Sequence, residues 1–576
     1  MQDSRTIYNL WLSIKDLNPE EREELLKIGD NEDEINARFG TELSFGTGGL
    51  RAKMMLGTGA MNVFTVAQAT EGLAKYIKST GAGARPVVIA YDSRINSKRF
   101  ARTAASVLAA NQIRVYIFDD LRPTPELSFA LRHLGCIAGI NITASHNPKE
   151  YNGYKVYWED GAQIAPEQAE QITRYIRGVK ISDDIHLTDF KEAVEGGLIT
   201  IIGSDIDEAY ISAVLSQAID PNIVKKVADK LSVVYTPLHG TGYRLVPEVL
   251  RRLGIKKLYV VPEQSQPDGN FPTVDKPNPE YKEAYACGIK LADRVSSDLI
   301  IATDPDADRV GVMARGRDGA FTGFTGNQVA LLLLDYIIDA YKRSGQMPPE
   351  PYAVKSIVTT ELMAKICRAG GVGLYNVLTG FKYIGEVIKK KEAEGRGSFI
   401  FGAEESCGYL KGTYIRDKDG VLASMLICEM AAHHISAGRT LVDALDELYK
   451  KYGYSLERTT EIIFDGYNAQ DRIKAVMSSL RQSPPADIAG VPVVSISDYL
   501  DGSLTDMRSG QKSSITGFPS SNVLRWELEN TDVIIIRPSG TEPKVKIYYL
   551  LSGEDKAPAP ARLEKYMSAV GELTKM

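Results

Sequence analysis

Four short apolar runs in this chain lead directly into unusually polar clusters, and this arrangement restricts the folds that are open to it. The runs and clusters are "GINI" into "TASHN", "DLIIAT" into "DPDADR", "SFIFG" into "AEES" and "DVIII" into "RPSGTEPK". In open α/β sheets, ligands collect outside the carboxyl ends of the strands. The clusters lie ~100 to 160 residues apart, which matches the spacing of separate domains. The sequence therefore predicts four domains around one cleft, each contributing a loop.

The segments between these clusters predict an α/β fold. "RPVVIAYDSR" has the pattern of a strand and its exit loop, "SKRFARTAASVLAANQ" that of a helix, and "IRVYIF" that of the next strand. The same rhythm returns at "LSVVYT", "KLYVV" and "DLIIATD", and again at "YAVKSIV", "VGLYNVL" and "SFIFGAE". Such alternation is typical of β-α-β units and largely parallel sheets. Glycine- and turn-rich breaks then predict domains at residues 1–205, 206–322, 323–453 and 454–576.

Composition excludes several classes of function. A chain of 576 residues is too long for a single core. Its net charge of −6 argues against a nucleic-acid or anionic-membrane partner, and no apolar run approaches the ~18 residues of a membrane span. The five cysteines are scattered and never form C-x-x-C, which fits a reducing compartment and excludes a thiolate zinc site. We therefore expect a cytoplasmic protein, and the sequence leaves monomer and dimer both open.

The "DPDADR" cluster predicts a site for a hard cation. It carries Asp304, Asp306 and Asp308 at alternate positions, followed by Arg309. In an extended segment, alternate residues point the same way, so the three carboxylates would converge. Like charges held together repel unless a cation lies between them, and oxygen ligands select a cation such as Mg²⁺. The alternative is a solvated acidic loop, which the alternation and the preceding strand disfavour.

Two further clusters offer groups for a phosphorylated sugar. "RPSGTEPK" supplies Arg537, Ser539, Thr541 and the backbone around Gly540, which suit a phosphate cradle better than a plain turn. "GAEESCGY" places Glu404 and Ser406, with Glu405 between them, at a strand exit where they could bind sugar hydroxyls. This second pattern is weak alone, because acidic loops are often just solvated.

The stretch "TASHNPKEYNGYKVY" contains a candidate nucleophile. Ser145 stands beside His146, before an Asn-Pro turn and ahead of Lys155. A polar turn is the simple alternative, because Ser, Asn, Pro and Gly are common turn residues. Arg51 in "FGTGGLRAKM" and Lys382 in "LTGFKYIG" are equally consistent with active-site groups and with surface charges. His239 has the pattern of a hydrogen-bonded loop residue, and His433 and His434 that of ordinary helix positions.

Together these groups favour phosphoryl transfer to and from a sugar hydroxyl. The set contains a serine nucleophile, a cation site, a phosphate cradle and a sugar-binding loop. The glycine-rich "FGTGGLRAKM" lacks the spacing of a nucleotide P-loop, so ATP is not the expected phosphate donor. A serine that carries the phosphate itself would explain that absence.

The chain resembles the α-D-phosphohexomutase superfamily, the phosphoglucomutase/phosphomannomutase enzymes, over essentially its whole length. The four signatures "TASHNP", "DPDADR", "GAEESCG" and "RPSGTEPK" occur in the family's order. "NPKEYNGYKVY", "TPLHGTG" and "LTGFKYIG" are most similar to the branch of longer phosphoglucomutases and phosphopentomutases. The resemblance implies a heart-shaped arrangement of three similar mixed α/β domains and a distinct C-terminal α+β domain.

The resemblance also implies roles for individual residues. Ser145 would be the phosphorylated serine, and its phosphate would hold Mg²⁺ together with Asp304, Asp306 and Asp308. His146 and Lys382 would be the acid/base candidates, although some members of the family have histidine in place of Lys382. The remaining roles are substrate binding by Glu404, Ser406, Arg537, Ser539, Gly540 and Thr541, and lining of the reaction centre by Arg51, Lys155 and Arg309.

The implied activity is an intramolecular phosphotransferase that interconverts sugar 1-phosphate and sugar 6-phosphate through a bound bisphosphate. α-D-Glucose 1-phosphate is the expected substrate, with phosphomannomutase and phosphopentomutase activities as alternatives. A sugar bisphosphate such as glucose 1,6-bisphosphate would prime the serine. Two rivals stay open: a phosphatase that uses an aspartate of "DPDAD" as nucleophile, and a sensor that binds sugar phosphates without turnover.

Overall fold

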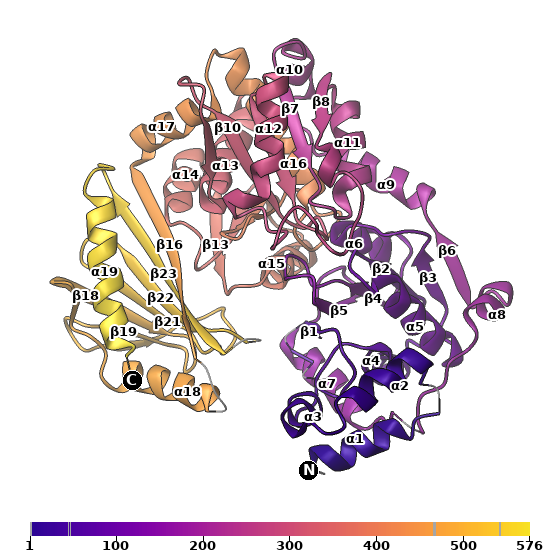
Figure 1. Ribbon diagram of the computed structural model, residues 1–576. Helices are drawn as coiled ribbons and strands as arrows, with labels where there is room; N and C mark the ends of the chain where they lie inside the picture. The colour runs from indigo at the N-terminus through magenta and orange to yellow at the C-terminus, as the bar shows by residue number, and fades with distance from the viewer. Residues whose placement is uncertain are drawn as a thin grey trace.

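The computed structural model describes residues 3–15, 17–43, 45–46, 48–181, 183–464, 468–540 and 543–575. Its strands form four sheets that follow one another along the chain, and each sheet has its own helices (Figure 1). The predicted α/β class is confirmed, and so is the division into four domains. The expected strands at "RPVVIAY", "DLIIAT" and "SFIFGAE" are present as β2 (Val87–Tyr91), β9 (Leu299–Thr303) and β14 (Ser398–Glu404).

The first sheet has the strand order β1-β5-β4-β2-β3-β6. Its parallel centre is antiparallel at one side, where β5 pairs with both β4 and β1. Besides β2, the strands of this sheet are β1 (Gly49–Lys53), β3 (Val115–Phe118), β4 (Ala138–Ile142), β5 (Tyr151–Trp158) and β6 (Ile199–Ile202). The helices are α4 (Val63–Ser79), α5 (Ser97–Ala110), α6 (Thr124–His133), α7 (Pro166–Arg177) and α8 (Phe190–Glu195).

The second and third sheets repeat the pattern of a parallel centre with an antiparallel side. Their orders are β11-β10-β9-β7-β8 and β13-β12-β14-β15. The second contains β7 (Ser232–Thr236), β8 (Lys257–Val260), β10 (Val310–Arg315) and β11 (Phe321–Phe324), with α9 (Ser204–Leu215), α10 (Pro221–Lys226), α11 (Gly242–Leu253) and α12 (Ala286–Val295). The third contains β12 (Pro351–Ser356), β13 (Gly373–Val377) and β15 (Gly408–Leu410), with α13 (Gly326–Ser344), α14 (Leu362–Gly370), α15 (Phe381–Glu394), α16 (Gly420–Ser436) and α17 (Leu441–Tyr452).

The fourth sheet differs from the other three, which confirms the distinct C-terminal α+β domain that the family resemblance implies. All of its described pairings are antiparallel, along the order β16-β23-β22-β21-β18-β19-β20. Consecutive strands such as β21, β22 and β23 are joined by short connections, which cannot return a chain for parallel pairing. The strands are β16 (Tyr454–Ile463), β17 (Asp487–Ile488), β18 (Val491–Asp498), β19 (Ser503–Asp506), β20 (Lys512–Ser514), β21 (Leu524–Leu528), β22 (Val533–Pro538) and β23 (Lys544–Gly553), with α18 (Ala469–Gln482) and α19 (Ala559–Leu573).

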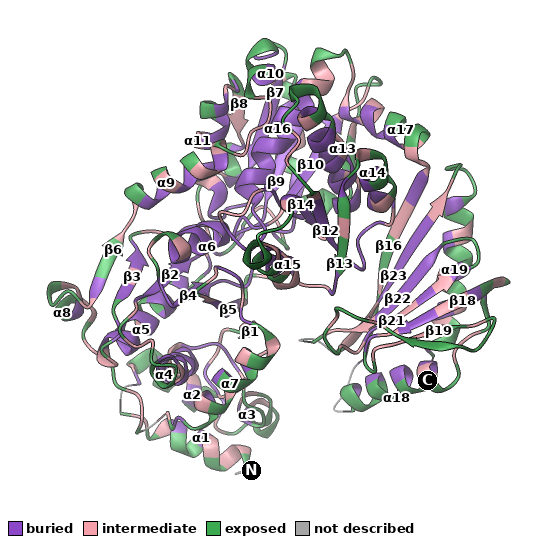
Figure 2. Cartoon of the chain, turned by 180° about the vertical axis from the view of Figure 1, so that it is seen from behind, coloured by how far each residue is buried: buried purple, intermediate pink, exposed green. Residues whose placement is uncertain are grey.

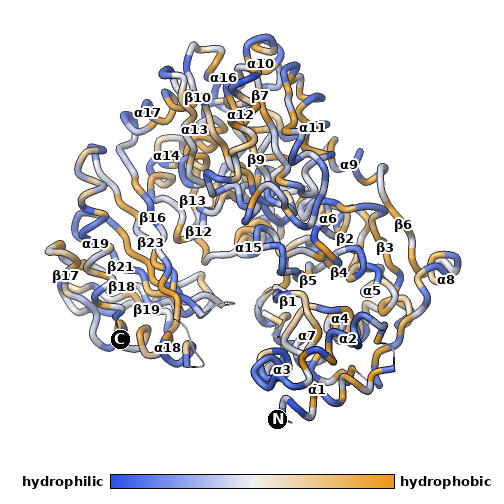
Figure 3. The backbone as a smooth tube through the Cα atoms, viewed as in Figure 1, coloured by the Kyte–Doolittle hydropathy of each residue, from blue (hydrophilic) through white to orange (hydrophobic). Residues whose placement is uncertain are grey.

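Buried apolar side chains pack against each sheet, and one cluster of them extends across the second and third domains. Every residue of β2, β4, β7 and β9 is buried, because helices cover both faces of these parallel strands (Figure 2). One cluster of apolar side chains joins the helices of the second and third sheets with α6 of the first. The backbone coloured by hydropathy shows the same apolar segments running through the strands (Figure 3).

Three N-terminal helices form a small core of their own beside the first sheet. They are α1 (Ser4–Leu12), α2 (Pro19–Lys27) and α3 (Glu32–Phe39), and their apolar cluster includes Trp11, Phe39 and Leu56. Asn18 caps α2 in a reciprocal capping box with Glu21, which the "NPEE" sequence favours.

Within the described residues, no single helix is long and apolar enough to cross a membrane. The helices α16 and α17 satisfy length and composition only as a pair, across a bend of 84°. α16 lies inside the protein and is buried from Gly420 to Ala432. The five cysteines are unpaired; four are buried, and Cys287 on α12 is partly exposed.

Candidate active site

Ser145 stands just beyond the end of β4, where the sequence predicts a displayed hydroxyl. Its side chain is buried, and its Oγ donates a hydrogen bond of 2.7 Å to Oδ2 of Asp304. The Nδ1 atom of His146 lies 3.1 Å from the same Oγ. The residue has φ of 51°, in the left-handed region that few residues other than glycine adopt. A left-handed residue at a site of chemistry needs surrounding contacts to hold it there.

Arg94 supplies those contacts, and the sequence reasoning missed it. The arginine is buried and donates to the carbonyl oxygens of Ser145 at 2.6 Å, Pro148 at 2.8 Å and Tyr151 at 3.0 Å. The carboxylate of Asp92 lies 3.3 Å from its Nε and balances the charge. Arg94 stands in the strand exit "YDSR", but the sequence does not show that this loop contacts the Ser145 loop, 51 residues later.

The three aspartates converge as predicted, although not by the predicted route. Their ligand oxygens all lie within 4.8 Å of one another, and the three side chains are buried. The segment is a turn rather than an extended strand: Ala307 has φ of 51°, and its amide donates to the carbonyl of Asp304 at 2.9 Å. The turn brings the carboxylates together more tightly than strand alternation would.

The electrostatics of this group fit a cation. Burial, followed by the neighbouring carboxylates, raises the pKa of Asp304 well above its usual range, and burial and Asp306 raise that of Asp308. Burial also opposes ionisation of Asp306, but the charge of Lys155, hydrogen bonds with Asp304 and Lys155, and the charge of Lys418 together outweigh it and lower the pKa of that carboxyl. Oδ1 of Asp306 and Oδ1 of Asp308 are buried and make no hydrogen bond to any described residue. Carboxylate oxygens left in this state are what a hard divalent cation requires.

Cationic side chains surround the aspartates. Nζ of Lys155 lies 2.8 Å from Oδ2 of Asp306, and Nζ of Lys418 lies 3.1 Å from Oδ2 of Asp308. The amide of Arg309 donates to Oδ1 of Asp304 at 3.0 Å, while its guanidinium pairs with Glu280 at 2.9 Å. Arg51 donates to the side chain of Asn147 at 2.9 Å, next to the Ser145 turn. Lys418, in "RDKDG", was not predicted, because a lysine between two aspartates resembles a solvated charge run.

The predicted sugar-binding loop, which carries Glu404, Glu405 and Ser406 and is called the third loop below, lies at the end of β14 as predicted. Glu404 is buried and accepts a hydrogen bond of 2.7 Å from the amide of Gly380, in the turn that precedes Lys382. Ser406 is partly buried. Burial, against the opposing charges of Glu167 and Glu386, lowers the pKa of Lys382 to about 8. Burial and the adjacent Glu404 raise the pKa of Glu405 to about 7.

The predicted phosphate-binding segment, called the fourth loop below, begins at the end of β22 as predicted: Arg537 is on the strand, and Ser539 and Gly540 follow it. Arg537 and Ser539 are partly buried, and Gly540 is exposed. Thr541 lies outside the described residues. Burial raises the pKa of Tyr383 on α15, and the positive charge of Arg537 acts in the opposite direction. The hydrogen bond from Ser145 to Asp304 joins the Ser145 loop directly to the aspartate loop.

His146 is partly buried, and burial, followed by the charges of Arg309 and Arg51, holds its pKa well below the usual range. The imidazole is therefore neutral at pH 7. Its lowered pKa makes it a weaker proton acceptor than a free histidine, although its Nδ1 lies beside the Ser145 hydroxyl.

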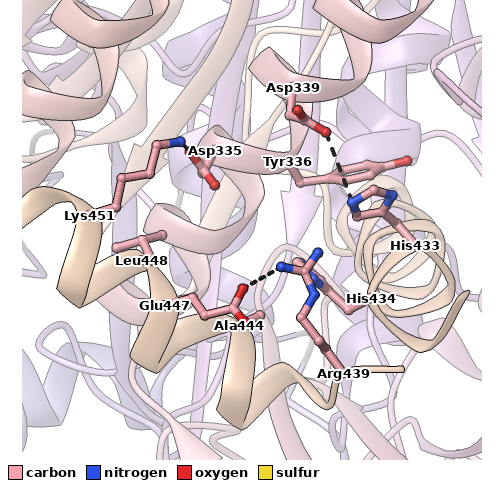
Figure 4. A pocket seen from close by; sticks show the side chains of 10 residues that line it. All are labelled: Asp335, Tyr336, Asp339, His433, His434, Arg439, Ala444, Glu447, Leu448 and Lys451. Carbon is pink, nitrogen blue, oxygen red and sulfur yellow. Dashed lines mark hydrogen bonds and ion pairs between the residues drawn. The ribbon is translucent and has the colours of Figure 1, made fainter. Parts of the chain in front are cut away.

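The other histidines occupy the places that the sequence predicts. His239 is buried in a loop, with its ring nitrogens 3.2 Å from the carbonyl of Gln266 and 2.9 Å from the hydroxyl of Thr273. His433 and His434 lie on the last turn of α16. They face a cavity of about 210 Å³ between α13, α16 and α17, whose charges pair among themselves, for example Lys451 with Asp335 (Figure 4).

Comparison with known proteins gives consistent matches along the chain. Models of the phosphoglucomutase/phosphomannomutase α/β/α domains I, II and III match residues 42–181, 208–317 and 325–452. A phosphoglucomutase of Staphylococcus saprophyticus is 40% identical over 526 residues, which cover 91% of this chain and 93% of that protein.

Two solved structures share the fold at low sequence identity. A phosphoglucomutase from Paramecium, described as an open form, is 17% identical with a TM-score of 0.68 and covers 93% of this chain and 95% of its own. A phosphoglucomutase/phosphomannomutase family protein from Burkholderia thailandensis is 18% identical with a TM-score of 0.64, covering 92% and 97%.

Proposed function

Because this chain belongs to the α-D-phosphohexomutases, in their phosphoglucomutase branch, we propose that it interconverts α-D-glucose 1-phosphate and glucose 6-phosphate through a phosphorylated Ser145. Sugar-phosphate mutase activity follows from the family. The choice of glucose rests on the phosphoglucomutase relatives, whose similarity covers nine-tenths of the chain. The observation that supports the role of Ser145 most directly is its hydrogen bond to Asp304, beside two buried carboxylate oxygens that make no hydrogen bond to any described residue.

We assign Asp304, Asp306 and Asp308, with the phosphate on Ser145, as the set that would hold Mg²⁺. A bound divalent cation would neutralise negative charge on the transferring phosphoryl group. Lys155, Lys418 and Arg309 would add positive charge from the protein, and their positions beside the aspartates support this assignment.

In the proposed reaction, a sugar hydroxyl attacks the phosphorus of phosphoserine. The P–O bond to Oγ of Ser145 breaks, a P–O bond to the sugar forms, the hydroxyl proton passes to a base, and the released Oγ takes up a proton; His146 and Lys382 are the candidates for these transfers. The bisphosphate then reorients in the site. Oγ of Ser145 loses its proton and attacks the other phosphate, whose P–O bond to the sugar breaks, and the sugar oxygen takes up a proton. A sugar bisphosphate such as glucose 1,6-bisphosphate is the proposed primer.

Substrate positioning is assigned to the third and fourth loops. Glu404 and Ser406 would bind sugar hydroxyls, and Arg537, Ser539, Gly540 and Thr541 would hold the phosphate that does not react. Arg51 would line the reaction centre beside the Ser145 turn.

We propose domain limits of 1–205, 206–322, 323–453 and 454–576. The last strand of the second sheet, β11, extends to Phe324, two residues beyond the second limit. A cytoplasmic location stays a prediction from the cysteine pattern.

The test is a coupled assay with glucose 1-phosphate, mannose 1-phosphate and ribose 1-phosphate, primed with glucose 1,6-bisphosphate. We expect isomerisation of glucose 1-phosphate above the other two, and a phosphorylated peptide that contains Ser145. Ser145→Ala should abolish isomerisation, and so should Asp304→Ala. Alanine meets the same left-handed backbone cost as serine, so the first variant removes the hydroxyl without relaxing the loop.

The rivals predict different results. An aspartate-dependent phosphatase would release phosphate and keep its activity in Ser145→Ala. A sensor would bind sugar phosphates with no turnover and no phosphopeptide. No isomerisation of any of the three sugars by the phosphorylated protein would overturn the proposal.

A further inference from the structure

The two carboxylate oxygens of Asp306 have different surroundings. Oδ2 accepts two hydrogen bonds, from Nζ of Lys155 at 2.8 Å and from Oγ1 of Thr124 at 3.0 Å. Oδ1 is buried and makes no hydrogen bond to any described residue. Two donors on one oxygen fix the rotation of the carboxyl group and therefore the direction in which the other oxygen points.

The Thr124 hydroxyl is itself held by Asn141. Nδ2 of Asn141 donates to Oγ1 of Thr124 at 2.6 Å, and both side chains are almost completely buried. A hydroxyl has one proton, so a threonine that accepts from the amide directs its own proton to Asp306. Hydrogen bonds in such a chain strengthen one another in a buried setting.

The fold brings these residues together from separate elements. Thr124 is the first residue of α6, and its backbone amide also donates to the carbonyl of Asp306 at 2.9 Å. Asn141 on β4 is the register partner of Lys155 on β5, so their side chains share one face of the sheet. Residues of the first domain therefore hold the side chain of Asp306, which belongs to the second domain, by hydrogen bonds.

We propose that Thr124 and Asn141 are positioning residues that aim Oδ1 of Asp306 at the divalent cation. The inference rests on the proposed metal site. Residues that orient a metal ligand without touching the metal typically affect affinity ~10–100-fold, and this is the loss we expect when the threonine hydroxyl is removed. The competing explanation is that the two hydrogen bonds merely join the domains, in which case their loss would lower stability without changing metal affinity.

The experiment measures Mn²⁺ binding by electron paramagnetic resonance on the full-length chain after treatment with glucose 1,6-bisphosphate. Thr124→Val replaces the hydroxyl with a methyl group of similar size and should weaken binding ~10–100-fold. Thr124→Ser keeps the donor and should stay within about threefold of the wild type. Saturating Mg²⁺ should restore most of the turnover of Thr124→Val, because the defect lies in holding the metal.

Thr70 provides the matched control. It is fully buried on α4, donates to the carbonyl of Val66 at 2.8 Å and is 3.1 Å from the hydroxyl of Tyr154, away from the aspartates. Thr70→Val should lower the melting temperature like Thr124→Val but leave Mn²⁺ affinity unchanged. If Thr124→Val does not fold, Asn141→Leu replaces it, and a loss of Mn²⁺ affinity is again expected.

The outcomes separate the inference from the proposed function. A wild-type chain that binds no Mn²⁺ would overturn both the metal site and the positioning role. A wild type that binds Mn²⁺, with Thr124→Val within threefold of it, would overturn the positioning role alone.

Discussion

At the scale of single residues, the site combines side chains that the sequence could identify with others that it could not. Ser145 and the three aspartates follow strands and have side chains of evident chemistry, so their motifs predicted side chains that the structure brings together. Arg94, Thr124 and Lys418 act through contacts with residues far away in the chain. Their types are common in loops and helix ends, and only the folded structure shows what they touch.

The lowered pKa of Lys382 predicts a pH dependence. If its neutral amine accepts the proton of the sugar hydroxyl, kcat should rise with pH through about 8 and level off above it. The second ionisation of a phosphate monoester lies near 6, so it should not be confused with this limb. Lys382→Met should lower kcat by ~10²–10⁴-fold and remove the limb.

The measurement is kcat at saturating substrate between pH 6 and 9.5. Lys389→Met is the control, because Lys389 lies on the same helix and pairs with Asp160 at 3.1 Å. A limb near pH 8 that survives in Lys382→Met would show that the base lies elsewhere, with His146 the remaining candidate.

At the scale of elements, burial decides what the sequence reveals. Strands such as β2 and β9 are apolar at every position because helices cover both faces, and their prediction was straightforward. β16 is buried only at its first two residues, is partly or fully exposed along the rest, and contains Glu457, Arg458 and Glu461, so it lacks a continuous apolar run. The pairing of β16 with β23 joins segments about 90 residues apart, and the sequence alone does not specify such partners.

The start of α16 gives a prediction for one element. Asp419 caps this helix by accepting from the amide of Leu422 at 2.8 Å, and it also accepts from the hydroxyls of Tyr210 at 2.8 Å and of Tyr414. Asp419→Ala would leave these buried donors without an acceptor and should cost about 2–4 kcal/mol. We expect the apparent melting temperature to fall by roughly 5–10 °C in differential scanning fluorimetry.

Two variants make this result specific. Asp419→Asn keeps an acceptor oxygen and should lose less. Asp189→Ala removes the exposed cap of α8, which accepts from the amides of Lys191 and Glu192, and should shift the melting temperature only slightly. Equal shifts for the Asp419 and Asp189 alanine variants would contradict the importance of the buried network.

At the scale of the whole molecule, the fourth domain is attached differently from the others. The second and third sheets share an apolar cluster with α6 of the first, whereas a separate small cluster joins the fourth sheet to the third. That cluster includes Ile357 and Leu378 from the third domain and Tyr499, Ile535 and Tyr548 from the fourth. A domain that shares only a small apolar cluster with its neighbour can rotate about that interface when a ligand bridges its loop to the rest.

We therefore predict that the fourth domain closes on the bound sugar phosphate. The radius of gyration from small-angle X-ray scattering should decrease when glucose 1,6-bisphosphate is added to the full-length protein. Arg537→Ala, which removes the proposed phosphate ligand, should abolish the decrease. An unchanged scattering curve at saturating ligand would contradict domain closure.

Because four of the five thiols are buried, the protein can be labelled with a fluorescent dye at one native cysteine. Cys287 on α12 is the one cysteine with partial exposure, so a maleimide dye should attach to the second domain at a single place. A cysteine introduced at the exposed Lys474 of α18 would carry a second dye on the fourth domain. Energy transfer between the two fluorophores could then follow individual molecules as they open and close during catalysis.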